Sequence, residues 1–371
     1  VADIPIEALS SKAPQYERKW TKTELPKKKA NFKNLKKINF KESFLKIISS
    51  SNHSNKKWIT EQYDQMVMCD TIQKSGSDAA IIRIHKKNKA IAVAVDSSAN
   101  YCKSHPITGG KQIVCENWRN LISMGAKPIA ITNCLNFGNP ENPEIMGQFA
   151  ETIIGIKEAC EYLDYPVVSG NVSFYNGTNK KNILPTPVIG GVGIIQKPEN
   201  KINHLFKKAG NSVLLIGKTF GHLYQSAFSN EILSINEGPP PEINLTNEKN
   251  NGEFVLELIK QNLALSVHDV SAGGTIVSLA EMSIDSSLGV KIEKPKNLNN
   301  IFEYFFGEDQ GRYLVEIDKN NLNKVKDLFK KNNIFHEMIG VTQKDNFELA
   351  GEFNIDIKEL SKINNKWYYN Y

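Results

Sequence analysis

The stretch Pro128–Gly170, PIAITNCLNFGNPENPEIMGQFAETIIGIKEACEYLDYPVVSG, decides the fold class. It begins with a short apolar run and ends with another, and both contain β-branched residues, which is typical of buried strands. Residues 142–165, between the two runs, have the apolar spacing of an amphipathic helix. The order strand, helix, strand predicts a layered α/β domain.

The same alternation continues on both sides of this stretch. Residues 78–101 contain two β-rich runs joined by the polar turn Lys86–Lys89, which predicts a hairpin. Apolar residues at helical spacing after residue 110 predict a helix, with Gly125 as its C-cap. Residues 185–195 form another strand-like run. We therefore expect one α/β domain over residues 63–196.

A second unit with the same alternation of strands and helices follows at residues 205–350. Its expected strands are 210–217, 311–317, 337–343 and one within 264–274 that runs into a small-residue turn. Its expected helices are 251–263, 275–284 and 321–332. These alternate, so they predict a second α/β domain. Residues 351–371 are expected to be a short strand and a tail, and residues 1–62 a basic, linker-like leading segment.

Composition narrows the class of protein. The chain has 371 residues, a net charge of +6 and five dispersed cysteines. Such cysteines favour reduced thiols in a cytoplasmic protein, and no apolar run is long enough for a membrane span. The basic run Lys27–Lys37 could be a nucleic-acid patch or a solvated connector. We favour the connector and expect no nucleic-acid partner, because no nucleic-acid module follows it.

The clearest candidate site is Gly170-Asn171-Val172-Ser173. Glycine lets the backbone approach a ligand closely. An asparagine oxygen suits Mg²⁺ alongside phosphate oxygens, and a serine hydroxyl can donate to a phosphate. From these four residues alone, an ordinary strand-to-turn corner is the favoured interpretation.

Three further loops follow expected strands. Asn133 and its neighbours lie where open α/β sheets bind ligands, although an Asn-rich turn that caps the next helix is an equal alternative. The loop His268–Gly274 offers a helix start that could hold an anion. Its His268-Asp269 pair could act as acid and base, but we favour a role in tying the loop together. Asp96 is a metal ligand or a strand cap.

Known nucleotide fingerprints are missing from the sequence. It contains neither a G-x-x-x-x-G-K-[ST] loop nor a G-x-G-x-x-G turn. A nucleotide site here would therefore be neither a P-loop nor a Rossmann site.

Taken in order, the motifs are specific. They are "APQYERKW", "SDAAIIRI", "LNFGNPENP", "PVVSGNVSFYN", "HDVSAGG" and "FGEDQGRYLVEI". In this order they resemble the C-terminal half of phosphoribosylformylglycinamidine synthase, large synthetase subunit, over nearly the whole chain. That family belongs to the aminoimidazole-ribonucleotide-synthetase-like superfamily.

The resemblance implies a fold and a reaction. Each half of such a protein has an N-terminal domain that pairs into a shared barrel and a C-terminal α/β domain. The reaction uses ATP and Mg²⁺ to convert formylglycinamide ribonucleotide to formylglycinamidine ribonucleotide with glutamine-derived ammonia. The implied partners are the missing N-terminal half, a glutaminase subunit or domain and a small accessory subunit.

The resemblance also implies site residues. Asn133 and Gly170 would contact ATP, Asn171 would bind Mg²⁺ and Ser173 would contact the substrate. Asn133 stands where the family typically has Asp, which removes a negative charge. Ala272 likewise replaces an Asp of the family's glycine loop.

No catalytic residue is assigned, because the family's catalytic histidines lie in the other half. A chain that begins at Val1 is expected to be a fragment that is inactive alone. One alternative is a non-catalytic nucleotide-binding module that supports the catalytic half. A second is a stand-alone relative of the selenophosphate or thiamine-monophosphate kinases, and the "APQYERKW" and "LNFGNPENP" stretches count against it.

Overall fold

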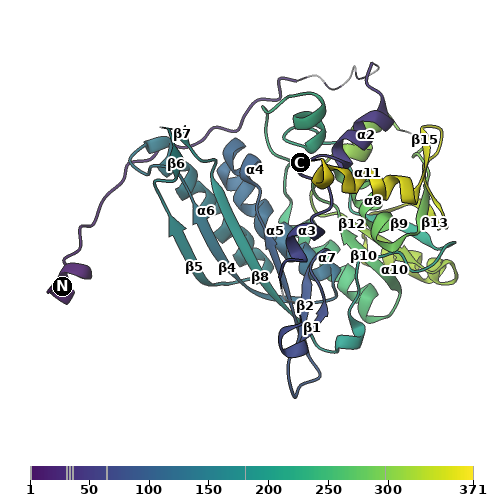
Figure 1. Cartoon of the computed structure of the whole chain (residues 1–371), viewed down its shortest axis with the longest axis horizontal. Helices are drawn as coiled ribbons and strands as arrows, with labels where there is room; N and C mark the ends of the chain where they lie inside the picture. Colours follow the sequence, from purple (N-terminus) through teal and green to yellow (C-terminus); the bar gives the residue numbers. More distant parts are fainter. Residues whose placement is uncertain are drawn as a thin grey trace.

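A computed structural model describes residues 2–30, 32, 35, 37–63, 66–179, 181–296 and 298–370. It has two sheet-based domains that lie side by side (Figure 1). The first is built on a six-stranded sheet in the order β1-β2-β3-β8-β4-β5 and the second on a seven-stranded sheet in the order β10-β12-β9-β13-β11-β14-β15. Mixed sheets with covering helices confirm the expected α/β class.

In the first domain, only β4 and β5 run parallel, and the other neighbouring strands are antiparallel. The helices of this domain cover one face of its sheet (Figure 1). The elements are β1 (Thr71–Gln73), β2 (Ala80–Arg83), β3 (Ala90–Asp96), α4 (Ala99–Ser104), α5 (Pro106–Ser123), β4 (Lys127–Asn136), α6 (Pro143–Leu163), β5 (Val167–Ser173) and β8 (Thr186–Ile195), with a small ribbon of β6 (Gly177–Thr178) and β7 (Lys181–Asn182).

The two faces of the six-stranded sheet differ in residue size. Along β3, Ala90, Ala92 and Ala94 are buried, whereas the outward Val95 is 67% exposed. Small residues let α5 approach the sheet closely, and β-branched residues cover the opposite face. The result is an apolar sheet face that no described helix of this chain covers.

Helices α5 and α6 pack through glycines. A Cβ added to Gly155 would collide with the Ile107 carbonyl oxygen, and one at Gly110 would lie 2.5 Å from the Thr152 carbonyl oxygen. Backbone atoms cannot move aside as a flexible side chain can. Two glycines therefore set the distance between these helices.

The glycine contact gives a stability prediction. Gly155→Val should lower the free energy of unfolding by about 1–3 kcal/mol, because the added atoms force the helices apart. Ile154→Val, on the part-exposed side of the same helix, is the control and should change little. Thermal unfolding followed by circular dichroism measures both, and equal midpoints for the two variants would contradict the contact.

The second domain packs helices on both sides of its sheet, and β10 and β12 lie next to the first domain's helices. The elements are β9 (Ser212–Ile216), a π-helical turn (Phe228–Ile232), α7 (Leu245–Lys260), β10 (Ala264–Asp269), α8 (Gly274–Ser286), β11 (Gly289–Ile292), α9 (Ile301–Phe306), β12 (Tyr313–Ile317), α10 (Leu322–Asn332), β13 (His336–Gln343), β14 (Asn346–Leu349), β15 (Phe353–Asp356) and α11 (Ile357–Tyr369). Short helical turns occur at α1 (Ile6–Leu9), α3 (Lys57–Thr60), Val67–Cys69, Pro198–Asn200 and Lys319–Asn321.

The two ends of the chain depart from the sequence-based expectation. Residues 351–371 were expected to end in a tail, but β15 and α11 occupy them. In the leading segment, α2 (Phe40–Ile48) packs into the second domain, where Phe44 stacks on Phe353 at 5.5 Å between ring centroids. Apolar contacts with residues distant in sequence hold both ends against the second domain. Among the described residues, no helix is long and apolar enough to cross a membrane.

Candidate functional site at the edge of the first sheet

The four residues assigned from the sequence lie on β4 and β5, the last two strands of the six-stranded sheet. Asn133 pairs with Gly170, Cys134 with Asn171, and Asn136 with Ser173. Neighbouring residues along a strand point to opposite faces. Asn133 therefore faces the helices, and Asn171 and Ser173 face the open side. The structure brings all four to one sheet edge but divides them between two faces.

On the open side, hydrogen bonds order the polar side chains. The Asn171 amide nitrogen lies 3.7 Å from the Cys134 sulfur, and the Asn136 amide donates to the Thr186 carbonyl at 3.2 Å. The Asn176 amide donates to the Ser173 hydroxyl and to the Phe137 carbonyl, each at 3.0 Å. Asn176 thus holds the Ser173 hydroxyl in place. The sequence analysis assigned no role to this asparagine.

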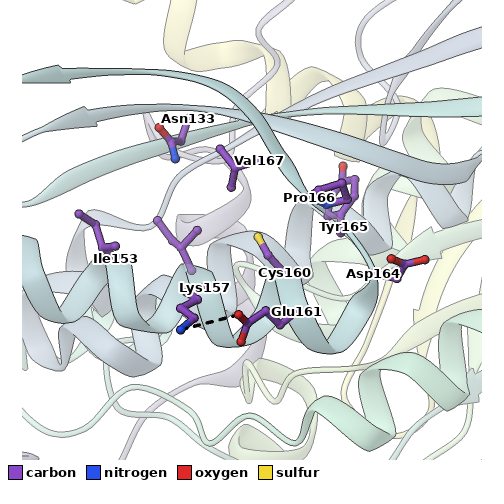
Figure 2. Close-up of a pocket in the computed structure, with 10 residues that line it drawn as sticks. Asn133, Ile153, Lys157, Cys160, Glu161, Asp164, Tyr165, Pro166 and Val167 are labelled. Atoms are coloured by element: carbon purple, nitrogen blue, oxygen red, sulfur yellow. Dashed lines mark ion pairs between the residues drawn. The ribbon is translucent and has the colours of Figure 1, made fainter.

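On the helix side, a pocket of about 370 Å³ lies between α6 and the ends of β4 and β5 (Figure 2). Its walls are mainly apolar, and the Asn133 side chain projects from β4 beside it. Among the described residues, the Asn133 amide has no hydrogen-bond partner. The lining consists of Asn133, Ile153, Ile156, Lys157, Cys160, Glu161, Asp164, Tyr165, Pro166 and Val167.

The open-side residues fit Mg²⁺ only in part. Asn171 has an amide oxygen to offer, and no carboxylate of the described residues hydrogen-bonds to this amide. Mg²⁺ in proteins usually takes one or two carboxylates together with water and phosphate oxygens. Asn171 therefore fits one position of a coordination shell, and a nucleotide's phosphates and groups outside this strand pair would fill the rest.

The anion position predicted at Gly273-Gly274 is occupied by the protein itself. The backbone N–H of Gly273 donates to the Glu308 carboxylate at 2.7 Å, just before α8 begins. The carboxylate also accepts from the Tyr101 hydroxyl at 2.5 Å. Burial raises the pKa of Glu308, and these donors oppose that rise. The helix start therefore holds an internal carboxylate that links two domains.

His268 joins the two domains, whereas the sequence analysis favoured a role in tying its own loop together. Its Nδ1 lies 2.8 Å from Asp78 of the first domain, and its Nε2 lies 3.1 Å from Glu281 on α8. Burial lowers the pKa of His268, but the Asp78 carboxylate outweighs burial and leaves that pKa well above its usual value. Asp78, His268 and Asp269 are close enough to group around a cation. Both nitrogens of the His268 ring, however, already face carboxylates.

The sequence analysis missed a buried arginine at the centre of the domain interface. Arg119 on α5 is fully buried, and its Nη1 lies 3.0 Å from the Glu248 carboxylate on α7. Its Nε lies 3.5 Å from Asp269 at the end of β10. The sequence does contain a signal for the burial of this arginine. Arg119 lies on the same helix face as Cys115 and Ile122, which are buried.

Asp96, at the end of β3, is held within the first domain. Its carboxylate accepts from the Asn117 amide at 2.7 Å and from the Asn120 amide at 2.8 Å. Burial raises the pKa of Asp96 to about 6, although these amides oppose the rise. In this structure, two side-chain amides of α5 hold the carboxylate. Both alternatives for Asp96, metal ligand and strand cap, stay predictions.

Asp269 gives a pH prediction. Burial raises its pKa to about 7, although Arg119 opposes the rise. An unfolded Asp titrates near 3.9, so between these values the folded state holds a proton that the unfolded state has lost. The stability from this group is therefore complete below about pH 4 and is lost as pH rises through about 7.

The variant Asp269→Asn tests this linkage. Its melting temperature should fall less than that of the unchanged chain between pH 5 and pH 8. Thermal unfolding at half-unit pH steps measures the difference. Parallel curves for the two proteins would show that Asp269 has an ordinary pKa.

Comparison with known proteins agrees with this architecture. Residues 76–195 match the N-terminal domain of AIR synthase related proteins, and residues 208–350 match their C-terminal domain. The two matches follow the two sheets closely. Two sheet domains joined by a buried polar interface thus define a protein of the AIR synthase related class, and the chain belongs to that family.

Its curated relatives are more specific. The chain is 51% identical over 372 residues to phosphoribosylformylglycinamidine synthase subunit PurL of Pelagibacter ubique, covering 100% of this chain and 51% of that protein. It is 41% identical to PurL of Rhodopseudomonas palustris strain BisB5, covering 100% of this chain and 50% of that protein. The chain therefore spans about half the length of the curated relatives it matches.

Solved structures share the fold. T. maritima PurL complexed with FGAR matches with a TM-score of 0.69 at 15% identity, covering 87% of this chain and 54% of that chain. AaThiL complexed with AMPPCP and TMP matches with a TM-score of 0.57 at 18% identity, covering 79% of this chain and 90% of that chain. These likenesses confirm the two-domain fold.

Proposed function

We propose that this chain forms one half of a phosphoribosylformylglycinamidine synthase. The complete protein would use ATP and Mg²⁺ to convert formylglycinamide ribonucleotide to formylglycinamidine ribonucleotide with ammonia from glutamine. The observation that carries the proposal is the match to PurL along the whole chain at 51% identity. We also propose a cytoplasmic location, which suits purine biosynthesis and the five free thiols.

Positioning and charge neutralisation account for catalysis in this type of reaction. ATP phosphorylates the formamide oxygen of the substrate, and ammonia then displaces the phosphate. Phosphoryl transfer depends on holding the nucleotide and neutralising its charge. In this account, Asn133 and Gly170 contact ATP, and the hydroxyl of Ser173, oriented by Asn176, donates a hydrogen bond to the substrate.

Asn171 is the proposed contact to Mg²⁺. The ion would neutralise negative charge on the transferring phosphoryl group. The Asn171 side chain lies on the open side of the sheet beside Cys134. A neutral amide holds a metal weakly alone, so this role needs the phosphates of bound ATP. Asn171 would therefore select the metal–nucleotide complex rather than free Mg²⁺.

The open sheet face is the proposed contact with the other half of the protein. It carries exposed apolar side chains on three neighbouring strands, of which Val95 and Val192 are examples. β5 is also the outermost strand, so its free backbone groups can pair with another strand. A shared barrel would cover both features. A glutaminase and a small accessory subunit would complete the assembly.

The second candidate is a non-catalytic module. It is favoured by the domain interface, where His268, Arg119 and Glu308 are all engaged in contacts within the chain. In that case the chain would support a catalytic half without contributing to its site. The position of the exposed Asn171 and the half-buried Ser173 at the sheet edge favours participation instead.

Genetic complementation tests the proposed function. In a chimera, this chain replaces the matched half of Pelagibacter ubique PurL. The chimera should restore purine-free growth to a bacterium whose own PurL is deleted, whereas the chain alone should not. The unmatched half alone is the control. Growth with neither the chimera nor the chain would count against the proposal.

A further inference from the structure

A separate cavity lies in the second domain. It has a volume of about 590 Å³, which is within the usual size range of ligand sites. Its walls come from the end of β9 and the loop after it, the first two turns of α7, the end of α10 and the start of β13. It shares no lining residue with the pocket beside α6. The sequence analysis assigned no site role to any of its residues.

The exposed part of this cavity is positively charged. Lys218 and Lys330 line it and are both exposed, and none of the lining residues is a carboxylate. Neither ammonium group has an ion-pair partner among the described residues. Lys218 lies instead over the Phe335 ring, with its Nζ 5.8 Å from the ring centroid. An anion that enters the cavity would therefore meet two unpaired cations and no carboxylate from its walls.

The buried part of the cavity offers a hydrogen-bond acceptor. Asn251 of α7 is only 8% exposed, and its amide nitrogen donates to the Gly311 carbonyl at 2.8 Å. This bond holds the amide in place. The amide oxygen of Asn251 has no hydrogen-bond partner among the described residues. A nearly buried residue of the cavity wall thus has an acceptor that no donor satisfies, which is costly unless a ligand or water supplies one.

His336 adds a second acceptor. Its Nδ1 lies 3.4 Å from the Ile334 carbonyl oxygen, which can only accept, so Nδ1 carries the proton. Burial lowers the pKa of His336, although the Ile334 carbonyl opposes the fall, so the ring is neutral at physiological pH. Its Nε2 is therefore an acceptor. The ring stacks on the buried Phe329 with 3.9 Å between ring centroids, which fixes its plane.

Gly217 determines the shape of the cavity where β9 ends. It adopts φ +91°, and its N–H donates to the Phe335 carbonyl at 3.0 Å. A Cβ at this position would lie 2.6 Å from the Gly311 carbonyl oxygen. Glycine alone combines this turn with so close an approach. The turn brings Lys218 next to Phe335 and so into the wall of the cavity.

We propose that this cavity binds a sugar phosphate. The phosphate would pair with the ammonium groups of Lys218 and Lys330. The sugar hydroxyls would donate to the Asn251 oxygen and to His336 Nε2. Inorganic phosphate would leave these two acceptors unused, and a plain sugar would leave the two lysines unused. The inference goes beyond the proposed function and does not depend on it.

This chemistry has two sources, a free sugar phosphate and a nucleoside monophosphate. Phe220 lines the cavity and is 78% exposed, so a base on the sugar would have an aromatic face to stack on. Ribose 5-phosphate and AMP differ in this base. Binding of AMP that is about tenfold tighter, with the difference lost in Phe220→Ser, identifies a nucleotide. Equal affinities identify a free sugar phosphate.

Isothermal titration of the 371-residue chain with ribose 5-phosphate, ribose and inorganic phosphate tests the proposal. Ribose 5-phosphate should bind about tenfold more tightly than either of the other two probes. Lys218→Met should weaken its binding by about tenfold, the effect of losing one charge-assisted hydrogen bond. His336→Phe, which keeps a ring against Phe329, should weaken the binding of ribose 5-phosphate but not that of inorganic phosphate.

The matched control for the charge is Lys331→Met. Lys330 and Lys331 both lie in the last turn of α10, but only Lys330 lines the cavity. Lys330→Met should weaken the binding of ribose 5-phosphate by about tenfold, whereas Lys331→Met should change it by less than about twofold. Equal losses in these two variants would overturn the inference, because only the overall charge of the helix end would then matter.

Two results with the unchanged chain would also overturn the inference. They are equal affinities for the three probes and no binding of ribose 5-phosphate. Circular dichroism checks that each variant is folded. If His336→Phe does not fold, the exposed Lys218 and Lys330 still provide the test.

Discussion

Arg119→Met is expected to lower the free energy of unfolding by about 3–5 kcal/mol, the usual cost of removing one partner of a buried ion pair. The Arg119 side chain is fully buried. It donates two hydrogen bonds to Glu248, at 3.0 and 3.1 Å, and one to Gln310 at 3.2 Å. Methionine would fill much of the space but would leave the Glu248 carboxylate buried without a cation.

The Arg119→Met substitution should weaken the docking of the two domains. Arg119 belongs to the first domain, and its three partners belong to the second. Denaturant unfolding measures the loss of stability, and limited proteolysis at the domain junction measures the loss of docking. The double variant Arg119→Met with Glu248→Gln should recover part of the stability, because the remaining amide carries no charge. A loss below about 1 kcal/mol in the single variant would contradict this account.

Asn171→Ala is expected to lower kcat/KM of the chimera by on the order of a hundredfold, the scale seen when one preorganised charge-stabilising group is removed. The Mg²⁺ concentration for half-maximal activity should rise as well, because the amide oxygen is the proposed metal contact. Asn171→Asp, which keeps an oxygen at this position, should rescue part of the activity. Steady-state kinetics at several Mg²⁺ concentrations measure all three proteins.

The control for this prediction is Ser169→Ala. Ser169 lies on the same strand and the same face, two residues before Asn171. Its substitution should leave both kcat/KM and the Mg²⁺ dependence close to those of the unchanged chimera. Equal losses in the two variants would indicate a general disturbance of β5 and would argue against a metal role for Asn171.

Local patterns were enough to predict most of the framework. The hairpin at residues 78–101 is confirmed by the antiparallel pairing of β2 and β3. Gly125 adopts φ +77° one residue after Met124, the C-cap of α5, so the expected glycine lies one position beyond the cap. These features depend on neighbouring residues alone. For that reason a single sequence reveals them.

The face of each site residue could not be predicted in the same way. Simple alternation from Val167 would place Asn171 on the same face as Val167, towards the helices. The pairing of β4 and β5 instead shifts after Ile131, so that Val168 is an extra residue without a partner. This irregularity turns Asn171 and Ser173 to the open side. It arises from pairing between distant strands, which the local pattern does not encode.

The domain interface also arises from contacts between residues that are distant in sequence. Arg119 and Glu248 are 129 positions apart, and no spacing rule joins them. An arginine on the apolar face of a helix indicates only that a buried partner exists. The docking of α2 and α11 onto the second domain likewise depends on contacts with distant residues. Tertiary packing decides these features, so only the structure shows them.

Turnover of formylglycinamide ribonucleotide by the purified chimera tests the central proposal most directly. ADP release is followed with ATP, Mg²⁺ and ammonium ion as the nitrogen source, so that no glutaminase is needed. The proposal predicts that ADP release by the chimera depends on both the ribonucleotide and ATP, and that the chain alone and the unmatched half alone are inactive. Turnover by the chain alone, or none by a folded chimera, would contradict it.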